Sequence, residues 1–310
     1  MKTKKTLIAA AALLAAIGLQ ATSITIDTAH VGDANNPADT ILSSGAYRGS
    51  ISYEYNIGTT EVTAGQYAAF LNAVASTGDT YGLYNANMYN LSHGCGIQKV
   101  DNGNGTYSYV ATKGDKLPVN YVSFYDAARF CNWLTTGNTE TGVYMLNGAS
   151  SLSLIQRDTT AWANGGVAVA NLDEWYKAAF YQGNGTYSAY ANGTNTAPTS
   201  SEANYNNYIG TITNGDFGVA SHYGTYGQNG SVWEWTDTVT GTNVHLRGGD
   251  FDGPAEYLAS SFNNSSFGPT NESNDVGFRV VSLQPIPEPG TYAAIFGALA
   301  LALAAYRRRK

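Results

Sequence analysis

The chain of 310 residues contains few of the side chains and motifs that mark common enzymes. It has only two cysteines, Cys95 and Cys131, so at most one disulfide can form within it, and the alternative is a pair of buried thiols. Its four histidines are not accompanied by a Gly-x-Ser-x-Gly or His-Glu-x-x-His motif. These absences exclude the hydrolases and zinc proteases that those two motifs identify.

Positive charge is also scarce once the two ends of the chain are set apart. Between them the chain has nine basic and twenty-two acidic side chains, which gives a net charge of −13. A surface of this sign repels phosphate backbones, so we expect no nucleic-acid partner. No Pro/Ser-rich linker or low-complexity block divides this region, and its length suits one large domain at residues 24–283.

The N-terminal end has the layout of a secretory signal peptide. Lys2, Lys4 and Lys5 precede an apolar run over residues 7–19, and small residues follow at positions 21–23. The run is too short to span a membrane and is charged only on its upstream side. The sequence therefore predicts a signal peptide over residues 1–23 and export through the inner membrane.

The C-terminal end, residues 284–310, has three parts: Pro287, Glu288 and Pro289, then an apolar stretch over residues 292–306, then four basic residues. About fifteen apolar residues are few for a permanent span, and the basic cluster holds its end on the cytoplasmic side. The tail resembles the PEP-CTERM sorting signal of Gram-negative bacteria. That resemblance implies a short transmembrane segment, an exosortase-type processing enzyme, and a final place in the cell envelope, at the cell surface or in the extracellular matrix.

Between the ends the composition predicts many turns. The sequence has 35 glycines and 23 tyrosines, and eight Asn-Gly pairs favour tight turns because both residues tolerate positive φ. The hexapeptide Gly-Asn-Gly-Thr-Tyr-Ser occurs at 103–108 and again at 183–188. Nothing around it repeats, so we expect two similar hairpin tips and no solenoid.

Three helices can be located from their N-caps and apolar faces. We expect them to begin at Thr63, at Ser123 with Asp126, and at Asn171 with Glu174. Their spacing predicts these buried positions: Tyr67, Phe70, Leu71 and Val74; Ala127, Phe130, Cys131 and Leu134; Leu172, Trp175, Tyr176 and Ala179. Short strands are expected over residues 51–57 and 275–283, among long loops. The fold class is therefore α+β with little regular secondary structure.

Three short motifs stand in order near the C-terminal end: Gly230-Ser231-Val232-Trp233-Glu234-Trp235, Leu246-Arg247-Gly248-Gly249 and Gly277-Phe278-Arg279. With the stretches at 55–63, 117–123 and 173–179, they resemble the formylglycine-generating enzyme (sulfatase-modifying factor) family over roughly residues 30–283. Several separated motifs in the right order are more specific than any single one. The resemblance implies the C-type-lectin-like fold of that family.

The family is a copper-dependent oxidase with two active-site cysteines, and the resemblance places those positions near Leu258 and Asn263. Neither side chain can ligate Cu(I) as a thiolate or undergo thiol oxidation, so we expect no copper and no catalytic residue from the family set. Cys131 matches a family cysteine whose usual partner position is Val280 here. It can pair instead with Cys95, since an exported protein meets an oxidising compartment.

The resemblance also implies a calcium site. Its ligands are the carboxylate of Glu234, backbone carbonyls near Gly230 and Val232, and an Asn or Asp at the position of Gly227. Gly227 offers no side-chain oxygen, so one of three neighbours would have to replace it: Gln228, Asn229 or Asp216. The alternative is a solvated or hydrogen-bonded Glu234 without a metal.

Four side chains near the motifs are candidates for binding a ligand: Trp235, Arg247, Asp250 and Asp252. Alternation along a strand places one of Trp233 and Trp235 in the core, and we favour Trp233 for that place. A guanidinium can instead tie loop carbonyls together, and loop acids are commonly just solvated.

Two functional hypotheses remain. The first is an exported noncatalytic module that binds a glycan or protein, or serves a structural role, with tyrosine and asparagine side chains as contacts. The second is a formylglycine-generating or related oxidative enzyme with a replaced active site. The missing cysteines favour the first.

Overall fold

The computed structural model describes residues 24–89, 92–148, 151–262 and 265–286. The predicted signal peptide lies outside these ranges, as do the sorting residues Pro287, Glu288 and Pro289. Within the ranges, no helix is both long and apolar enough to cross a membrane.

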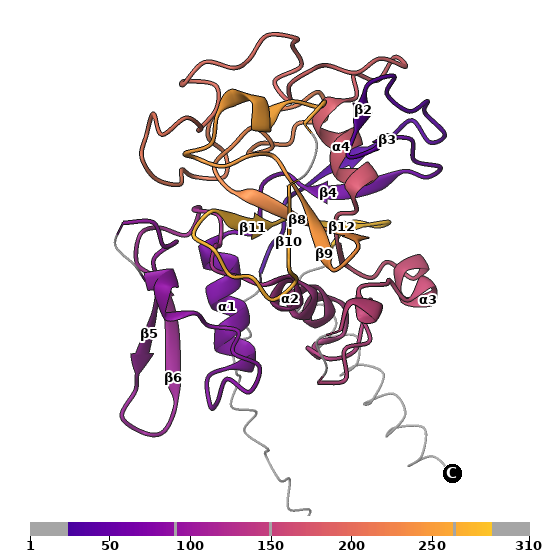
Figure 1. The fold of residues 1–310 in the computed structure, drawn as a ribbon. Coiled ribbons are helices and arrows are strands. Elements are labelled where there is room, and N and C mark those ends of the chain that lie inside the picture. Colours follow the sequence, from indigo (N-terminus) through magenta and orange to yellow (C-terminus); the bar gives the residue numbers. More distant parts are fainter. Residues whose placement is uncertain (1–23, 90–91, 149–150, 263–264, 287–310) are drawn as a thin grey trace, which may run out of the picture.

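Two four-stranded sheets form the centre of the domain (Figure 1). The first has the antiparallel order β1-β4-β12-β7, with strands Thr28–Val31, Tyr55–Gly58, Val280–Ser282 and Ala168–Val169. The second has the order β10-β9-β8-β11, with strands Ser266–Phe267, Asn243–Arg247, Trp233–Thr240 and Val276–Phe278. In the second sheet β11 runs parallel to β8, and the other neighbours are antiparallel.

In the described part of the chain four α-helices surround the sheets: α1 (Ala64–Val74), α2 (Phe124–Thr136), α3 (Thr159–Ala163) and α4 (Leu172–Phe180). The three predicted starts are confirmed, and each is a reciprocal capping box in which the N-cap and the third helical residue bond to each other's backbone: Thr63 with Gln66, Ser123 with Asp126, Asn171 with Glu174. The sequence did not predict the five-residue α3, which has no buried residue. Three short 3₁₀ turns are also present: Ala86–Tyr89, Leu152–Leu154 and Ala255–Leu258.

Aromatic rings on the predicted helix faces join α1 to α2 and to the sheet. The ring centroids of Tyr67 and Phe70 lie 6.0 and 5.4 Å from that of Phe130. Phe130 in turn lies 5.5 Å from Phe278 of β11. These edge and offset contacts place the core between the helices and the strands that carry the family motifs.

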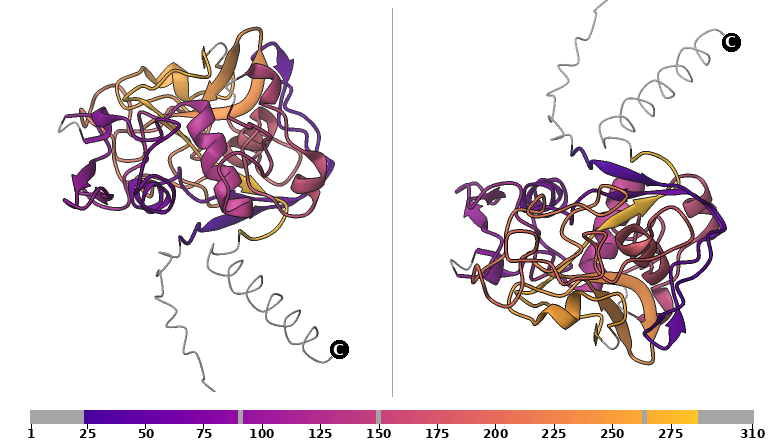
Figure 2. Two further views of the ribbon diagram at one scale, coloured as in Figure 1. Left: turned by 90° about the horizontal axis from the view of Figure 1, so that it is seen from below. Right: turned by 90° about the horizontal axis from the view of Figure 1, so that it is seen from above.

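Two hairpins extend from this centre. β2 (Leu42–Ser43) pairs with β3 (Ala46–Tyr47) beside α4, and β5 (Ile97–Asp101) pairs with β6 (Tyr107–Ala111) beside α1, on the other side of the molecule (Figure 1). Residues 181–232, all described, contain no helix or strand and form the long loops seen in Figure 2. The predicted α+β class with many loops is confirmed.

The repeated hexapeptide forms two turns with the same bonds. In each, the threonine N–H donates to the side-chain oxygen of the asparagine two residues earlier, Thr106 to Asn104 and Thr186 to Asn184, both at 3.1 Å. The first turn connects β5 to β6, and the second lies next to an isolated bridge between Tyr181 and Tyr187. The prediction of two similar hairpin tips is confirmed.

Both predicted strands differ from those observed. β4 begins only at Tyr55, because Ile51 bonds to the loop at Asn35 and Asn36 instead of a neighbouring strand. The stretch 275–283 divides at Arg279 into β11 and β12, which belong to different sheets. Local alternation could not reveal this change of sheet, since it depends on what Arg279 contacts.

Candidate functional site

The three family motifs meet on adjacent strands of the second sheet. β8 lies between β9 and β11. Glu234 of β8 therefore pairs with Arg247 on one side and with Gly277 on the other. The sheet thus brings Arg247 and Gly277, which are 13 and 43 positions after Glu234 in the sequence, to either side of it.

Glu234 is fully buried and holds the guanidinium of Arg279. Arg279 donates from Nε to Oε2 at 2.6 Å and from Nη2 to Oε1 at 2.7 Å, and the indole Nε1 of Trp175 donates to Oε2 at 2.9 Å. Burial lowers the pKa of Arg279, but the charge and hydrogen bonds of Glu234 outweigh that effect and raise it. The remaining donors of Arg279 reach the carbonyls of Gly58 and Tyr226, so the ion pair also ties two loops to the sheet.

The calcium ligands predicted around Glu234 do not form an open oxygen site. Both Glu234 oxygens accept hydrogen bonds from Arg279, and Oδ1 of Asn229 accepts one from the Ala191 N–H at 3.1 Å. Gly230 and Val232 are both buried. Because a cation at Glu234 would compete with the guanidinium, this set does not fit calcium. Among the described residues, no three His, Cys, Asp or Glu side chains form a group that could hold a metal.

Both tryptophans of the first motif belong to the core. Trp235 is fully buried, and its Nε1 donates to the carbonyl of Val122 at 2.9 Å. Trp233 is 5% exposed and packs near Tyr257 and Phe262. The expectation that Trp235 contacts a ligand is therefore corrected, because residues 233–236 of β8 are all buried.

Arg247 is a structural residue that holds the loop at 259–262. Its Nη1 donates to the carbonyl of Phe262 at 2.7 Å, and its Nη2 donates to those of Ala259 and Ser260 at 3.4 and 3.3 Å. The side chain is buried, no ion pair joins it to a carboxylate of the described residues, and burial lowers its pKa to about 10. Arg247 therefore ties loop carbonyls together, as the alternative interpretation expected. The expectation that it contacts a ligand is corrected.

Asp250 and Asp252 lie together at the turn after β9. Asp250 is 5% exposed, and its Oδ1 accepts the N–H of Gly253 at 2.8 Å, whereas Asp252 is exposed. Burial, with the charges of Asp275 and Asp252, raises the pKa of Asp250 to about 7. Of the four ligand-binding candidates, Asp252 is the one that reaches solvent.

The family cysteine positions carry no reactive side chain where the structure describes them. Leu258 is 1% exposed and packs in a small apolar cluster with Ala203 and Tyr205. Asn263 lies outside the described residues. The segment near Leu258 therefore serves packing.

The two cysteines are not joined in a disulfide. Cys95 and Cys131 are both buried free thiols, the second on α2. Burial raises the pKa of each thiol, for Cys131 well above its usual range. Of the two alternatives open from the sequence, the structure contains the pair of buried thiols.

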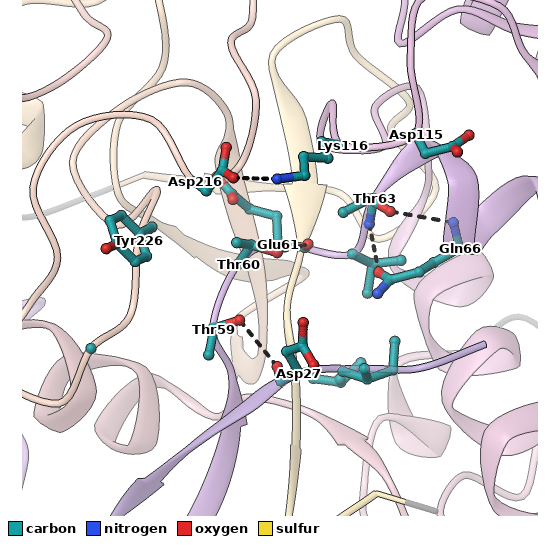
Figure 3. Close-up of a pocket in the computed structure, with 14 residues that line it drawn as sticks. Asp27, Thr59, Thr60, Glu61, Thr63, Gln66, Asp115, Lys116, Asp216 and Tyr226 are labelled. Atoms are coloured by element: carbon teal, nitrogen blue, oxygen red, sulfur yellow. Dashed lines mark hydrogen bonds and ion pairs between the residues drawn. The ribbon is translucent and has the colours of Figure 1, made fainter. Parts of the chain in front are cut away.

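Sequence reasoning missed Glu61, which follows β4 in the wall of a cavity of about 420 Å³ (Figure 3). The cavity is bordered by the Lys116–Asp216 ion pair at 2.7 Å and by the cap at Thr63. Glu61 is 1% exposed, its carboxylate has no hydrogen-bond partner among the described residues, and Arg279 Nη2 is 3.9 Å away. Burial and then the charge of Glu234 raise its pKa to about 8. A glutamate next to a helix cap gave no signal of this burial.

A second cavity, of about 490 Å³, lies between residues 38–41 and 185–189. Asn195 and Ser260 complete its wall. Ser260 belongs to the loop that Arg247 holds, and its N–H donates to the carbonyl of Ala189 at 2.8 Å. The sequence marked only the turn at 183–188 in this region.

Known proteins resemble the chain in fold and in family. The family model of the sulfatase-modifying factor enzyme 1-like domain matches residues 31–283. Treponema denticola variable protein 1 is 20% identical, with a TM-score of 0.56 over 84% of this chain and 98% of that one. CarF is 22% identical, with a TM-score of 0.55 over 84% and 98%. PvdO from Pseudomonas aeruginosa is 16% identical, with a TM-score of 0.50 over 84% and 93%.

No curated protein matches the chain. The similarity to the solved structures shows the fold, and the family model matches most of the sequence. The chain therefore belongs to the sulfatase-modifying factor enzyme 1-like family and has its C-type-lectin-like fold.

Proposed function

We propose that the domain is a noncatalytic binding module that recognises a glycan or a protein. The observation that carries this proposal is the loop at 258–262, where the family resemblance predicts a reactive cysteine. Leu258 is buried there, and Arg247 donates hydrogen bonds to the carbonyls of Ala259, Ser260 and Phe262. The loop is thus a fixed wall beside a cavity of about 490 Å³, which is within the size range of small-ligand sites.

The alternative is an oxidative enzyme with a replaced active site, and one experiment separates the two. The purified full-length chain is analysed for bound copper and incubated with a Cys-x-Pro-x-Arg peptide. We expect neither stoichiometric copper nor formylglycine, because neither Leu258 nor Asn263 can act as a soft thiolate ligand. Stoichiometric copper or aldehyde formation would overturn the proposal.

We propose that the module works outside the inner membrane, at the cell surface or in the matrix. The signal-peptide layout of residues 1–23 and the three-part tail from Pro287 support this location. On this proposal an exosortase-type enzyme processes the tail, which contacts the membrane until then. Mass spectrometry of the mature protein tests the processing of the tail, and an intact end at Lys310 would contradict the sorting proposal.

Calcium binding stays a prediction, and buried oxygens near Gly227 support it better than Glu234 does. The Glu61 carboxylate and Oδ1 of Asn204 have no donor among the described residues. Asn204 and Gly227 line one small cavity, and a Cβ on Gly227 would lie 2.4 Å from both carboxylate oxygens of Glu61. Calcium prefers hard oxygen ligands of this kind.

The thermal midpoint of unfolding, compared in calcium and in EDTA, tests this prediction. We expect calcium to raise the midpoint of the natural chain and to have less effect on Asn204→Ala, since a ligand that binds the folded state stabilises it. Equal midpoints in calcium and EDTA would contradict calcium binding.

A further inference from the structure

The larger cavity is a polar cleft with an aromatic residue at its edge. We name it the Asp39 cleft and define it by residues 38–41, 185–189, Asn195 and Ser260. Its lining consists mostly of hydroxyl, amide and small side chains. Neither lysine nor arginine is among the residues that line it.

Several hydrogen-bonding groups of the cleft are available to a ligand. Asn195 uses Oδ1 to accept the N–H of Ala189 at 2.9 Å, and among the described residues its Nδ2 has no protein partner. The hydroxyl of Thr40 likewise has no partner in the described part of the chain. A cleft that offers both a donor amide and a hydroxyl, which donates and accepts, suits a ligand rich in hydroxyl groups.

An aromatic platform adjoins the cleft on β3. Tyr47 is 61% exposed, more than any other large apolar side chain of the described residues. It lines a smaller hollow of about 260 Å³ with Ala38, Asp39 and Thr40, which are also residues of the cleft. A flat exposed ring offers rigid contact area to an apolar face, such as the C–H face of a sugar.

The walls of the cleft are held in place by buried hydrogen bonds. Asp39 accepts the hydroxyl of Tyr176 at 2.7 Å and the N–H of Ile41 at 3.1 Å. On the other wall, Tyr187 accepts Nδ2 of Asn36 at 2.7 Å. The cleft therefore exists before a ligand arrives, which lowers the entropic cost of binding.

The negative charge of the domain and the bonds of its arginines favour an uncharged ligand. The domain carries a net charge of −13. Arg48, whose carbonyl accepts the N–H of Asp39, and Arg247, which bonds to Ser260, both have side-chain partners already. Arg48 donates to the carbonyls of Ser43 and Ser44, and Arg247 donates to the loop carbonyls beside Ser260. An acidic or sulfated saccharide would meet repulsion without a compensating cation.

We propose that the Asp39 cleft binds a neutral oligosaccharide, with one sugar ring stacked on Tyr47 and the hydroxyls of the next bonded to Asn195 and Thr40. This inference rests on the proposed binding function and names its ligand class and site. It places recognition on residues 38–47, residues 185–195 and Ser260, and neither Glu234 nor Asp250 lines this cleft.

The experiment uses the full-length chain on an array of neutral and acidic glycans, followed by calorimetric titration with the neutral glycan that binds best. Tyr47→Ala and Asn195→Ala test the cleft. Tyr208→Ala is the matched control, because Tyr208 is 57% exposed and does not line the cleft. Thermal unfolding of each variant checks that the fold is kept.

We expect neutral glycans to bind, and Tyr47→Ala to weaken binding about tenfold, a loss typical of one aromatic contact. Tyr208→Ala should bind like the natural chain. Equal effects of Tyr47→Ala and Tyr208→Ala would overturn the site while the binding function stands. Two outcomes would overturn the neutral oligosaccharide as the ligand and leave the binding function standing. One is a preference for acidic glycans, and the other is binding of a protein when no glycan on the array binds. If neither a glycan nor a protein ligand binds, the proposed function fails with it.

Discussion

The guanidinium of Arg279 forms a two-point ion pair with Glu234, at 2.6 and 2.7 Å, and neither side chain is exposed to solvent. Arg279 stands where the chain passes from β11 in one sheet to β12 in the other. Its partner lies on β8, beside β11. The pair therefore fixes the junction between the two sheets of the domain.

Removing the guanidinium should destabilise the domain strongly. In Arg279→Met, Glu234 and Glu61 stay buried without a neighbouring cation. Breaking a buried pair by deleting one partner typically costs about 3–5 kcal/mol. Urea unfolding at pH 7, followed by tryptophan fluorescence, measures the free energy of unfolding.

Lys116→Met is the matched control for this change. Lys116 pairs with Asp216 at 2.7 Å, but its side chain is 69% exposed, so solvent screens the pair. We expect unfolding curves that superimpose on those of the natural chain. Similar losses in both variants would show that burial does not decide the strength of these pairs.

Glu61 should make stability fall as pH rises. Burial raises its folded pKa from 4.5 to about 8, so between these values the folded chain holds a proton that the unfolded chain releases. The contribution is complete below about pH 4.5 and is lost as pH rises through about 8. Glu61→Gln removes this dependence. As pH rises across this window, the free energy of unfolding of the variant should therefore increase relative to that of the natural chain, by up to about 1.4 kcal/mol per pH unit.

The measurement is urea unfolding of both chains at several pH values, in EDTA so that only protons bind the carboxylate. Taking the difference between the chains cancels the other titrating groups, including Asp126 and Asp250, whose pKa values burial raises to about 7. A difference that stays constant with pH would contradict a raised pKa at Glu61.

The sequence predicts what is encoded locally. Each capping box lies within four consecutive residues, so Thr63, Ser123 and Asn171 mark their helices without tertiary information. The order of separated motifs likewise identifies the family. What could not be predicted depends on contacts between distant residues.

Arg279 shows the limit most clearly. Residues 275–283 alternate like one strand, but Arg279 bonds to Gly58, Tyr226 and Glu234, which are 45 to 221 positions away, and the chain changes sheet there. The Asp39 cleft has the same character, because its walls come from residues 38–41, 185–189 and Ser260. The sequence predicted that tyrosine and asparagine side chains bind a ligand. It could not identify Tyr47 and Asn195 among its many tyrosines and asparagines.

Gly227 should tolerate a methyl group far less than a neighbouring glycine does. It has φ of +75°, and a Cβ there would lie 2.4 Å from both carboxylate oxygens of Glu61. Gly224 has φ of +84° with nothing within 4 Å of a Cβ. Gly224→Ala should cost about 1–2 kcal/mol through left-handed strain alone, and Gly227→Ala about 1–3 kcal/mol more through overlap with the carboxylate.

Chemical unfolding of the two variants measures this difference directly. Adding Glu61→Gln does not relieve the overlap, because glutamine is as large as glutamate, whereas Glu61→Ala should relieve part of it. Equal losses for Gly224→Ala and Gly227→Ala would show that the Glu61 side chain does not lie against Gly227.

The two thiols should be unreactive until the domain unfolds. Cys95 and Cys131 are buried and free, and burial raises the pKa of both, so little of the reactive thiolate is present at neutral pH. Without added reductant, titration with a chromogenic disulfide should modify neither thiol in the native chain and both in guanidinium chloride. Cys95→Ser should then have one titratable thiol in guanidinium chloride instead of two, and none in the native state, like the natural chain. If the unfolded natural chain has no titratable thiol, the cysteines are joined after all, and the packing around Cys95 and α2 must differ from the one described.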